Sequence, residues 1–239
     1  MTTVYPKIGR ALRSTIAGAS AGTLIEWYDF FLYGAVAGIL AKTFFSGLPD
    51  YTAYLFSSLT FAAGFLVRPV GAAIFGSLGD RWGRKNTFLI TMTIMGCATV
   101  IVGFIPSYGD IGLAAPIILI AARLMQGLAV GGEYGGAATF VAEHSPPGIR
   151  GFTTSFIQLT CTMGLLLALL IVLVVRTIFG ESEFQTWAWR IPFLLSAILL
   201  VIAIWIRRRL DESSLFKQHL EEGTLSKTLS EKIFPPAAI

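Results

Sequence analysis

Long apolar runs alternate with short charged segments along the chain, and this pattern predicts a bundle of membrane-crossing α-helices. A helix that rises 1.5 Å per residue needs about 20 apolar residues to cross the hydrocarbon of a bilayer. Six runs meet this length: residues 14–41, 51–79, 86–109, 111–142, 151–175 and 184–206. We therefore expect an all-α integral membrane protein, with six transmembrane helices within residues 14–209. A basic arm over residues 1–13 and a polar tail or linker over residues 210–239 are predicted on either side.

The composition supports a membrane location and excludes several other classes. Hydrophobic residues make up 54% of the 239 residues and charged residues 13%, whereas about a quarter of a soluble domain is charged. The net charge of +4 does not indicate nucleic-acid binding, because the cations gather at the ends of apolar runs. No catalytic set, metal-ligand cluster or cofactor loop is evident, so we expect no enzyme activity, cofactor or metal. Cys97 and Cys161 lie within apolar runs and are predicted to be buried, inert thiols.

The distribution of cations predicts the orientation of the bundle. Ten cations fall on one side of the six predicted spans: Lys7, Arg10, Arg13, Arg81, Arg84, Lys85, Arg150, Arg207, Arg208 and Arg209. Three fall on the other side, namely Lys42, Arg176 and Arg190. Because loops rich in Lys and Arg stay in the cytoplasm, both termini are expected to be cytoplasmic, in a bacterial-type plasma (inner) membrane.

Five charged residues interrupt the apolar runs: Glu26, Asp29, Arg68, Arg123 and Glu133. Each costs about 2.5–3.5 kcal/mol on insertion scales, so each requires a physical reason. Helical spacing places Glu26, Asp29 and Tyr33 on one stripe of the first span, and Arg123, Gln126 and Glu133 on one stripe of the fourth. Glu26 and Arg123 each lie roughly 18 Å into a core about 30 Å thick, so opposite charges are expected near the midplane.

These charges have two interpretations. A carboxylate whose partner moves can take up and release a proton, and charges inside a membrane commonly mark a transport pathway. Alternatively, the charges form fixed ion pairs that hold the bundle together. The sequence favours the pathway for Glu26, Asp29 and Arg123. Arg68 precedes Pro69 and is instead slightly more typical of a residue that braces a kink.

The fourth span carries small residues at four-residue spacing. Gly127, Gly131 and Gly135 fall on one stripe, with Gly132 and Gly136 beside it. Small residues let helix backbones approach closely where lipid provides no hydrophobic driving force. This stripe is therefore expected to contact other helices.

Residues 76–85 form a charged segment punctuated by glycine between the second and third runs. We expect a tight turn in which Gly79 and Gly83 adopt unusual backbone angles, while Arg81, Arg84 and Lys85 hold it in the cytoplasm. An ordinary positive loop would explain the cations but neither the paired glycines nor Asp80. A phosphate-binding loop is excluded, because the GK[ST] ending and a preceding strand are missing.

The order G-x-L-x-D-R-x-G-R-K in this segment closely resembles the signature of major facilitator superfamily transporters. Further segments resemble the metabolite:H+ symporters of that superfamily: residues 26–30, 123–127, 131–134, 150–151, 189–193 and 211–213. The resemblance implies a cytoplasmic gate formed by Gly76, Asp80, Arg81, Gly83, Arg84, Glu143 and Arg150. The proton-coupling and substrate pathway is predicted to contain Glu26, Asp29, Tyr33, Arg68, Arg123, Gln126 and Glu133.

The resemblance also implies a function and its partners. We expect a proton-coupled symporter of a small organic solute, such as an organic acid or a zwitterionic osmolyte, working in a lipid bilayer and without nucleic acid. The superfamily uses two six-helix halves, whereas this sequence resembles the N-terminal half, so a second half is expected as another copy or a separate chain. Three alternatives stay open: a fragment of a full symporter, a working half, and a non-transporting remnant or assembly subunit. A channel is disfavoured, because the charges do not repeat in a ring-forming pattern.

Overall fold

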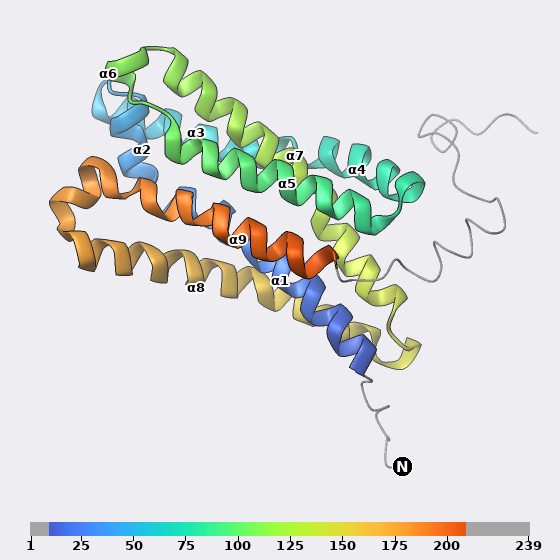
Figure 1. Cartoon of the computed structure of the whole chain (residues 1–239). Helices are drawn as coiled ribbons and strands as arrows, with labels where there is room; N and C mark the ends of the chain where they lie inside the picture. The colour runs from blue at the N-terminus through green and yellow to red at the C-terminus, as the bar shows by residue number, and fades with distance from the viewer. Residues whose placement is uncertain (1–9, 209–239) are drawn as a thin grey trace, which may run out of the picture.

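The computed structural model describes residues 10–208, with all side chains except those of residues 10, 11, 14, 15, 84 and 134. Most of the predicted basic arm and all of the predicted tail lie outside these residues. The described residues contain no strand and form a bundle of long helices that lie side by side (Figure 1). The elements are α1 (Arg10–Ala35), α2 (Ala37–Phe44), α3 (Asp50–Leu66), α4 (Arg68–Trp82), α5 (Arg84–Phe104), α6 (Tyr108–Ile111), α7 (Ala114–Glu143), a 3-10 turn (Pro147–Ile149), α8 (Arg150–Glu183), a π-helical turn (Phe184–Ala188) and α9 (Arg190–Arg208).

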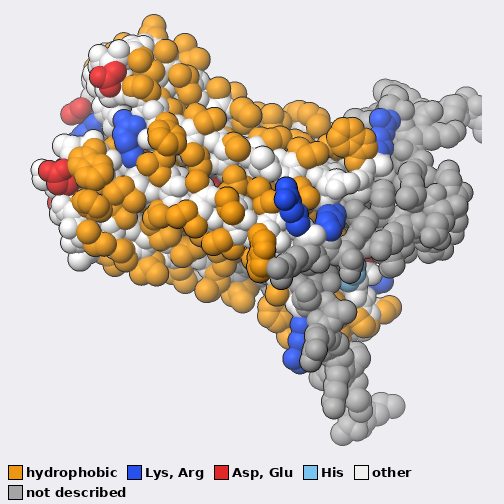
Figure 2. Space-filling model, viewed as in Figure 1, with side chains coloured by type: hydrophobic (Ala, Val, Ile, Leu, Met, Phe, Trp, Pro, Cys, Tyr) orange, Lys and Arg blue, Asp and Glu red, His pale blue; other side chains and the backbone are white. Residues whose placement is uncertain are grey.

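The six predicted spans correspond to these helices, and the all-α membrane fold is confirmed. Five segments are long and apolar enough to cross a membrane: Asp50–Trp82, Lys85–Phe104, Ala114–Glu143, Pro147–Ala188 and Arg190–Arg208. A sixth span combines α1 with α2, which are bent by 63° at Val36. On the face in Figure 2, hydrophobic side chains cover the middle of the bundle, and charged side chains gather toward its two ends.

Helix α1 organises the bundle, because it packs against α5, α7, α8 and α9. Its aromatic side chains are enclosed: Tyr28 and Tyr33 are fully buried. The Tyr28 hydroxyl donates a hydrogen bond of 2.8 Å to the carbonyl oxygen of Pro192 in α9, which ties the first span to the sixth. In the middle of α1, the polar side chains Thr23, Glu26 and Asp29 are likewise buried in the protein.

The closest helix contacts involve glycines of α7, as the small-residue stripe predicts. A Cβ atom on Gly127 would overlap the carbonyl oxygen of Gly64, and one on Gly131 would overlap the backbone of Arg68. The prediction is wrong for Gly135, which is exposed and whose Cβ atom would meet nothing within 4 Å. At that point α7 and α4 are separated by space, and Gly135 lines the two pockets between them.

The predicted turn over residues 76–85 is much shorter than expected. Helix α4 continues through Gly76 and Gly79 to Trp82, and α5 begins at Arg84. Only Gly83 separates the two helices. Its φ is 88° and its ψ is 150°, a backbone conformation that residues other than glycine rarely adopt. The expectation of an unusual backbone is therefore right for Gly83 and wrong for Gly79.

The prediction of two buried thiols is wrong. Cys97 lies on α5 with an exposed side chain, and Cys161 on α8 is only partly buried. Lipid-facing and core positions of a membrane helix are both apolar, so an apolar run does not indicate which of the two a cysteine occupies.

Candidate functional site

Six of the seven predicted pathway residues are buried, and they fall into two groups rather than one. Glu26, Asp29, Tyr33, Arg123, Gln126 and Glu133 are each at most 3% exposed, whereas Arg68 is partly exposed. One group, which we call the central cluster, consists of Asp29, Tyr33, Thr99, Arg123, Gln126 and Ser196. The other, the charge triad, consists of Glu26, Glu133 and Arg207.

In the central cluster, Asp29 is held by a hydroxyl group. The Ser196 Oγ of α9 donates a hydrogen bond of 2.6 Å to Asp29 Oδ1. Both residues are at most 2% exposed, so this carboxyl group lies between α1 and α9 without contact with solvent. Ser196 has no charge and does not neutralise Asp29.

Arg123 lies across the same interior and is held by neutral groups. Its Nη1 donates to Gln126 Oε1 at 2.7 Å, and Gln126 Nε2 donates to Thr99 Oγ1 at 2.7 Å. The guanidinium carbon lies 3.8 Å from the centre of the Tyr33 ring, which provides a cation–π contact. Its Nε and Nη2 are buried and have no hydrogen-bond partner among the described residues. Arg123 thus keeps unused donors inside the bundle.

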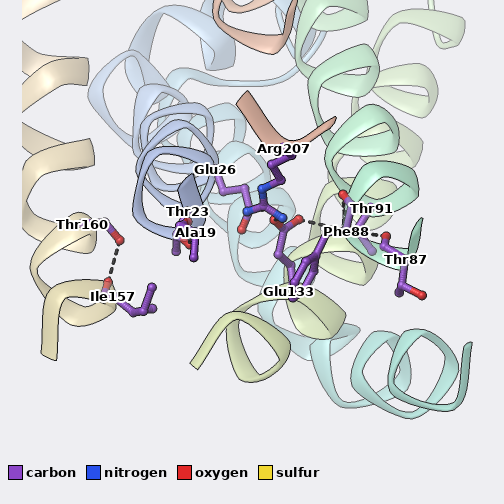
Figure 3. Close-up of polar contacts among 10 residues, drawn as sticks. All are labelled: Ala19, Thr23, Glu26, Thr87, Phe88, Thr91, Glu133, Ile157, Thr160 and Arg207. Carbon is purple, nitrogen blue, oxygen red and sulfur yellow. Dashed lines mark hydrogen bonds and ion pairs between the residues drawn. The ribbon is translucent and has the colours of Figure 1, made fainter. Parts of the chain in front are cut away.

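The charge triad contains Arg207, which we predicted from the sequence to lie on the cytoplasmic side of the last span. Arg207 is 2% exposed and lies between two carboxyl groups (Figure 3). Its Nη2 lies 3.7 Å from Glu26 Oε1, and its Nη1 forms an ion pair with Glu133 Oε1. Glu133 Oε2 also accepts a hydrogen bond of 2.8 Å from Thr91 Oγ1 of α5. Glu26 therefore pairs with Arg207 and not with Arg123, the opposite charge that the sequence places at a similar depth.

The prediction for Arg207 fails because the apolar run ends before the helix does. Helix α9 continues to Arg208, and three positions on one face are buried: Ser196, Ala203 and Arg207. Their separations of seven and four residues follow the helical repeat. That spacing is the feature of the sequence that indicates a buried Arg207. It is easily missed, because Arg208 and Arg209 beside it are typical of a cytoplasmic segment.

Arg68 borders a pocket of about 520 Å³ between α1, α4, α7 and α8. The pocket is also lined by Trp27, Gln158 and Cys161. The guanidinium carbon lies 5.5 Å, 4.5 Å and 4.3 Å from the rings of Trp27, Phe30 and Phe65. Nε and Nη2 have no hydrogen-bond partner among the described residues. Arg68 stands directly after the break between α3 and α4 at Val67, so it lies at a kink and also faces a pocket.

The predicted gate residues lie around α4 and the ends of α7 and α8. A second pocket of about 300 Å³ is lined by Gly76, Asp80 and glycines of α7. Asp80 and Glu143 are partly buried, Arg81 is exposed, and Arg150 Nε donates a hydrogen bond of 3.3 Å to the carbonyl oxygen of Ser145. The Arg84 side chain lies outside the described part of the chain. A gating role for these residues stays a prediction. Within residues 10–208, no group of three or more His, Cys, Asp or Glu is placed to hold a metal ion.

Comparisons with known proteins identify the family. The family model described as "Sugar (and other) transporter" matches residues 15–233. The chain is 43% identical over 211 residues to the proline/betaine transporter of Escherichia coli, covering 88% of this chain and 42% of that protein. It is 44% identical over 199 residues to the alpha-ketoglutarate permease of the same organism, covering 83% of this chain and 46% of that protein. The E. coli shikimate transporter is 41% identical over 212 residues, covering 88% of this chain and 48% of that protein.

Solved structures show the same fold. The partially occluded, inward-open xylose transporter XylE from E. coli superposes with a TM-score of 0.80 at 20% sequence identity. The match covers 94% of this chain and 54% of the XylE chain. The chain therefore spans about half the length of the relatives it matches, and its fold is that of the N-terminal half. Family model, relatives and fold agree, and the chain belongs to the sugar (and other) transporter family of the major facilitator superfamily.

Proposed function

We propose that this chain forms one half of a proton-coupled symporter that carries a small organic solute with a carboxylate group across the bacterial inner membrane. The observation that carries the proposal is the enclosed Asp29 carboxyl group, which lies beside Ser196 in an interior that also holds Arg123. A buried carboxyl group without a fixed cationic partner is suited to binding and releasing a proton. The relatives named for proline and betaine, alpha-ketoglutarate and shikimate support the solute class, since these compounds all contain a carboxylate.

Arg68 is the residue that we propose for the solute's carboxylate. Its guanidinium borders the pocket of about 520 Å³ and has two donors without protein partners. Arg123 also has two such donors, but it is only 1% exposed, lines neither pocket described above and already bonds Gln126. Arginine binds carboxylates through paired, charge-assisted hydrogen bonds. In this proposal, Trp27 and Phe65 form the apolar wall next to that contact.

A second six-helix half completes the proposed transporter, and the pocket beside Arg68 faces it. Superfamily members bind solutes between two halves near the membrane midplane and alternate access by rocking one half against the other. The gate residues Asp80, Arg81 and Glu143 would contact the second half on the cytoplasmic side. The two alternatives are a working half that pairs with its own copy and a non-transporting remnant or assembly subunit.

Uptake into sealed vesicles tests the proposal. With a co-expressed second half, the chain is expected to accumulate radiolabelled proline, betaine or alpha-ketoglutarate only when a pH gradient is imposed. The same uptake by the chain alone would favour the working half that pairs with its own copy. Asp29→Asn should abolish accumulation and leave membrane insertion intact, whereas Asp50→Asn, at an exposed position, should change neither. Uptake that is equal with and without the gradient would contradict symport. Absence of uptake in both preparations would favour the remnant or subunit.

The role of Arg68 has a separate measurement. Arg68→Gln should raise the solute concentration for half-maximal uptake about tenfold or more, because a hydrogen bond to a charged group is worth roughly 1.5–3 kcal/mol. Arg68→Lys should recover part of this loss. An unchanged half-saturation concentration in Arg68→Gln would remove this residue from the solute site.

A further inference from the structure

The charge triad is a built site with contributions from four helices. Glu26 comes from α1, Glu133 from α7 and Arg207 from α9, and each is at most 3% exposed. Helix α5 contributes Thr91, which donates to Glu133, and Phe88, whose ring centre lies 4.8 Å from the Arg207 guanidinium carbon. Figure 3 shows the three charged side chains converging between these helices.

Helix α1 leaves room for the guanidinium. A Cβ atom on Gly22 would overlap Nε, Nη2 and Cζ of Arg207. Gly22 precedes Glu26 by one helical turn, so the guanidinium packs against the backbone of α1 beside the Glu26 carboxyl group. Arg207 is thus held by shape and by charge, unlike an arginine at the end of a span that reaches out to water.

The triad contains two carboxyl groups and one cation. If both carboxyl groups were ionised, the enclosed site would carry a net charge of −1. Other charged side chains on the surrounding helices do not cancel it: Asp29 lies one turn away on α1 and is also acidic, and Arg123 lies about 15 Å along α7 from Glu133. Lys85 of α5 donates a hydrogen bond to the carbonyl oxygen of Arg208, and these two cations lie at the ends of their helices, where Arg208 is exposed, rather than inside the site. Among the described residues, α5 contributes neutral Thr91 and Phe88 at this level.

An uncompensated charge is expensive to bury, and two carboxyl groups that share one buried site retain a proton. The carboxyl groups of Glu26 and Glu133 lie close together, because they contact Nη2 and Nη1 of the same guanidinium. We infer that Glu26, Glu133 and Arg207 form a proton-binding site, separate from Asp29, in which one proton taken from solvent is held by the two carboxyl groups. Its use in transport rests on the function proposed above, whereas its occupancy by a proton does not.

The location of Arg207 links this proton to the position of α9. Arg207 lies in the last turn of α9, and its contacts hold that turn against α1 and α7. Loss of the proton leaves an excess negative charge, which is stabilised only if water reaches the triad or the helix ends separate. Protonation therefore favours the closed contact that the structure shows.

Infrared difference spectroscopy of the full purified chain in lipid, without solute, tests the inference. At neutral pH the spectrum should contain the carbonyl band of a protonated carboxylic acid that shifts in heavy water. The band should persist in Asp29→Asn, which removes the other enclosed carboxyl group of α1. In that background, Glu26→Gln and Glu133→Gln should each abolish the band, because the remaining carboxylate then pairs with Arg207 alone. Glu183→Gln, at an exposed position, should leave it unchanged.

Arg207→Gln gives the opposite expectation. Without the cation, both carboxyl groups should be protonated, and the band should grow about twofold. If one of the variants Glu26→Gln and Glu133→Gln does not fold, the other is sufficient for the test. The inference is overturned if Asp29→Asn lacks the band, or if the band survives in the glutamine variants. Because no transport is measured, such a result would leave the proposed symport untouched, whereas a positive spectrum without uptake would contradict symport alone.

Discussion

Replacing Gly131 by alanine tests how closely α7 and α4 pack. The added Cβ atom would overlap the backbone carbonyl group of Arg68, which is rigid and cannot turn aside as a side chain can. Restoring an ordinary contact of about 3.5 Å requires the helices to separate by on the order of 1 Å. Overpacking of this kind typically costs about 1–3 kcal/mol. A change of about 2 kcal/mol shifts the folding equilibrium roughly 30-fold.

Gly135→Ala is the matched control, because Gly135 lies one turn further along α7 and a Cβ atom there meets nothing within 4 Å. Alanine is favoured over glycine in a helix by up to about 1 kcal/mol, and both variants gain this equally. Because this gain cancels between them, we expect the two variants to differ by the overpacking cost of about 1–3 kcal/mol, with Gly131→Ala less stable. Unfolding of the purified chain in mixed detergent micelles, followed by circular dichroism, measures the difference. Equal stabilities would refute the close contact between α7 and α4.

Three further outcomes follow from other parts of the chain. Gly83→Ala should lower stability by about 1–3 kcal/mol in the same unfolding assay, since φ is 88°, whereas exposed Gly148→Ala should have little effect. Hydrogen bonds from the Ser107 hydroxyl and backbone N–H lower the pKa of Asp110 below its ordinary 3.8. Their contribution to the free energy of unfolding is therefore complete above pH 3.8 and is lost as the pH falls through the pKa of the folded state. In Ser107→Ala, the free energy of unfolding should therefore fall less on acidification than in the unchanged protein. An identical dependence of stability on pH would argue against the contact. Cys97→Trp should insert normally, and brominated lipid should quench its fluorescence more than that of the unchanged protein, because the position is exposed on a span; no additional quenching would contradict this exposure.

The spans could be predicted because each apolar run is bounded by charges. One internal break had a signal: Pro69 indicated a kink beside Arg68, and α4 begins at Arg68 after Val67. The other had none: Val36 separates α1 from α2, yet the residues on both sides of it are apolar. Hydrophobicity indicates which residues lie within the membrane, but it does not indicate where the axis of a helix changes direction. Bends depend on contacts from other helices, such as the 3.0 Å hydrogen bond from Ser57 Oγ to the carbonyl oxygen of Ala37.

Burial of the charged residues was predictable, and their pairing was not. Helical spacing correctly placed Glu26, Asp29 and Glu133 inside the bundle, because a charge in hydrocarbon must face protein or water. The partner of Glu26 depends on where α9 ends relative to α1, which is a tertiary property. Three consecutive arginines resemble a cytoplasmic anchor, and only the register of α9 shows that Arg207 points inward.

Helix α8 (Arg150–Glu183) is interrupted at Gly180, where φ is 80° and ψ is 163°. Its uninterrupted part covers residues 150–179, which corresponds to about 45 Å at 1.5 Å per residue. Hydrocarbon is only about 30 Å thick, and a bilayer with its headgroups measures about 40–45 Å. The distance along the helix from Arg150 to Arg176 is about 39 Å, so one guanidinium can lie in each headgroup layer when the helix stands upright. The length of helix α8 thus couples the bundle to bilayer thickness. In a thinner bilayer α8 must tilt, and the helices packed along it tilt with it.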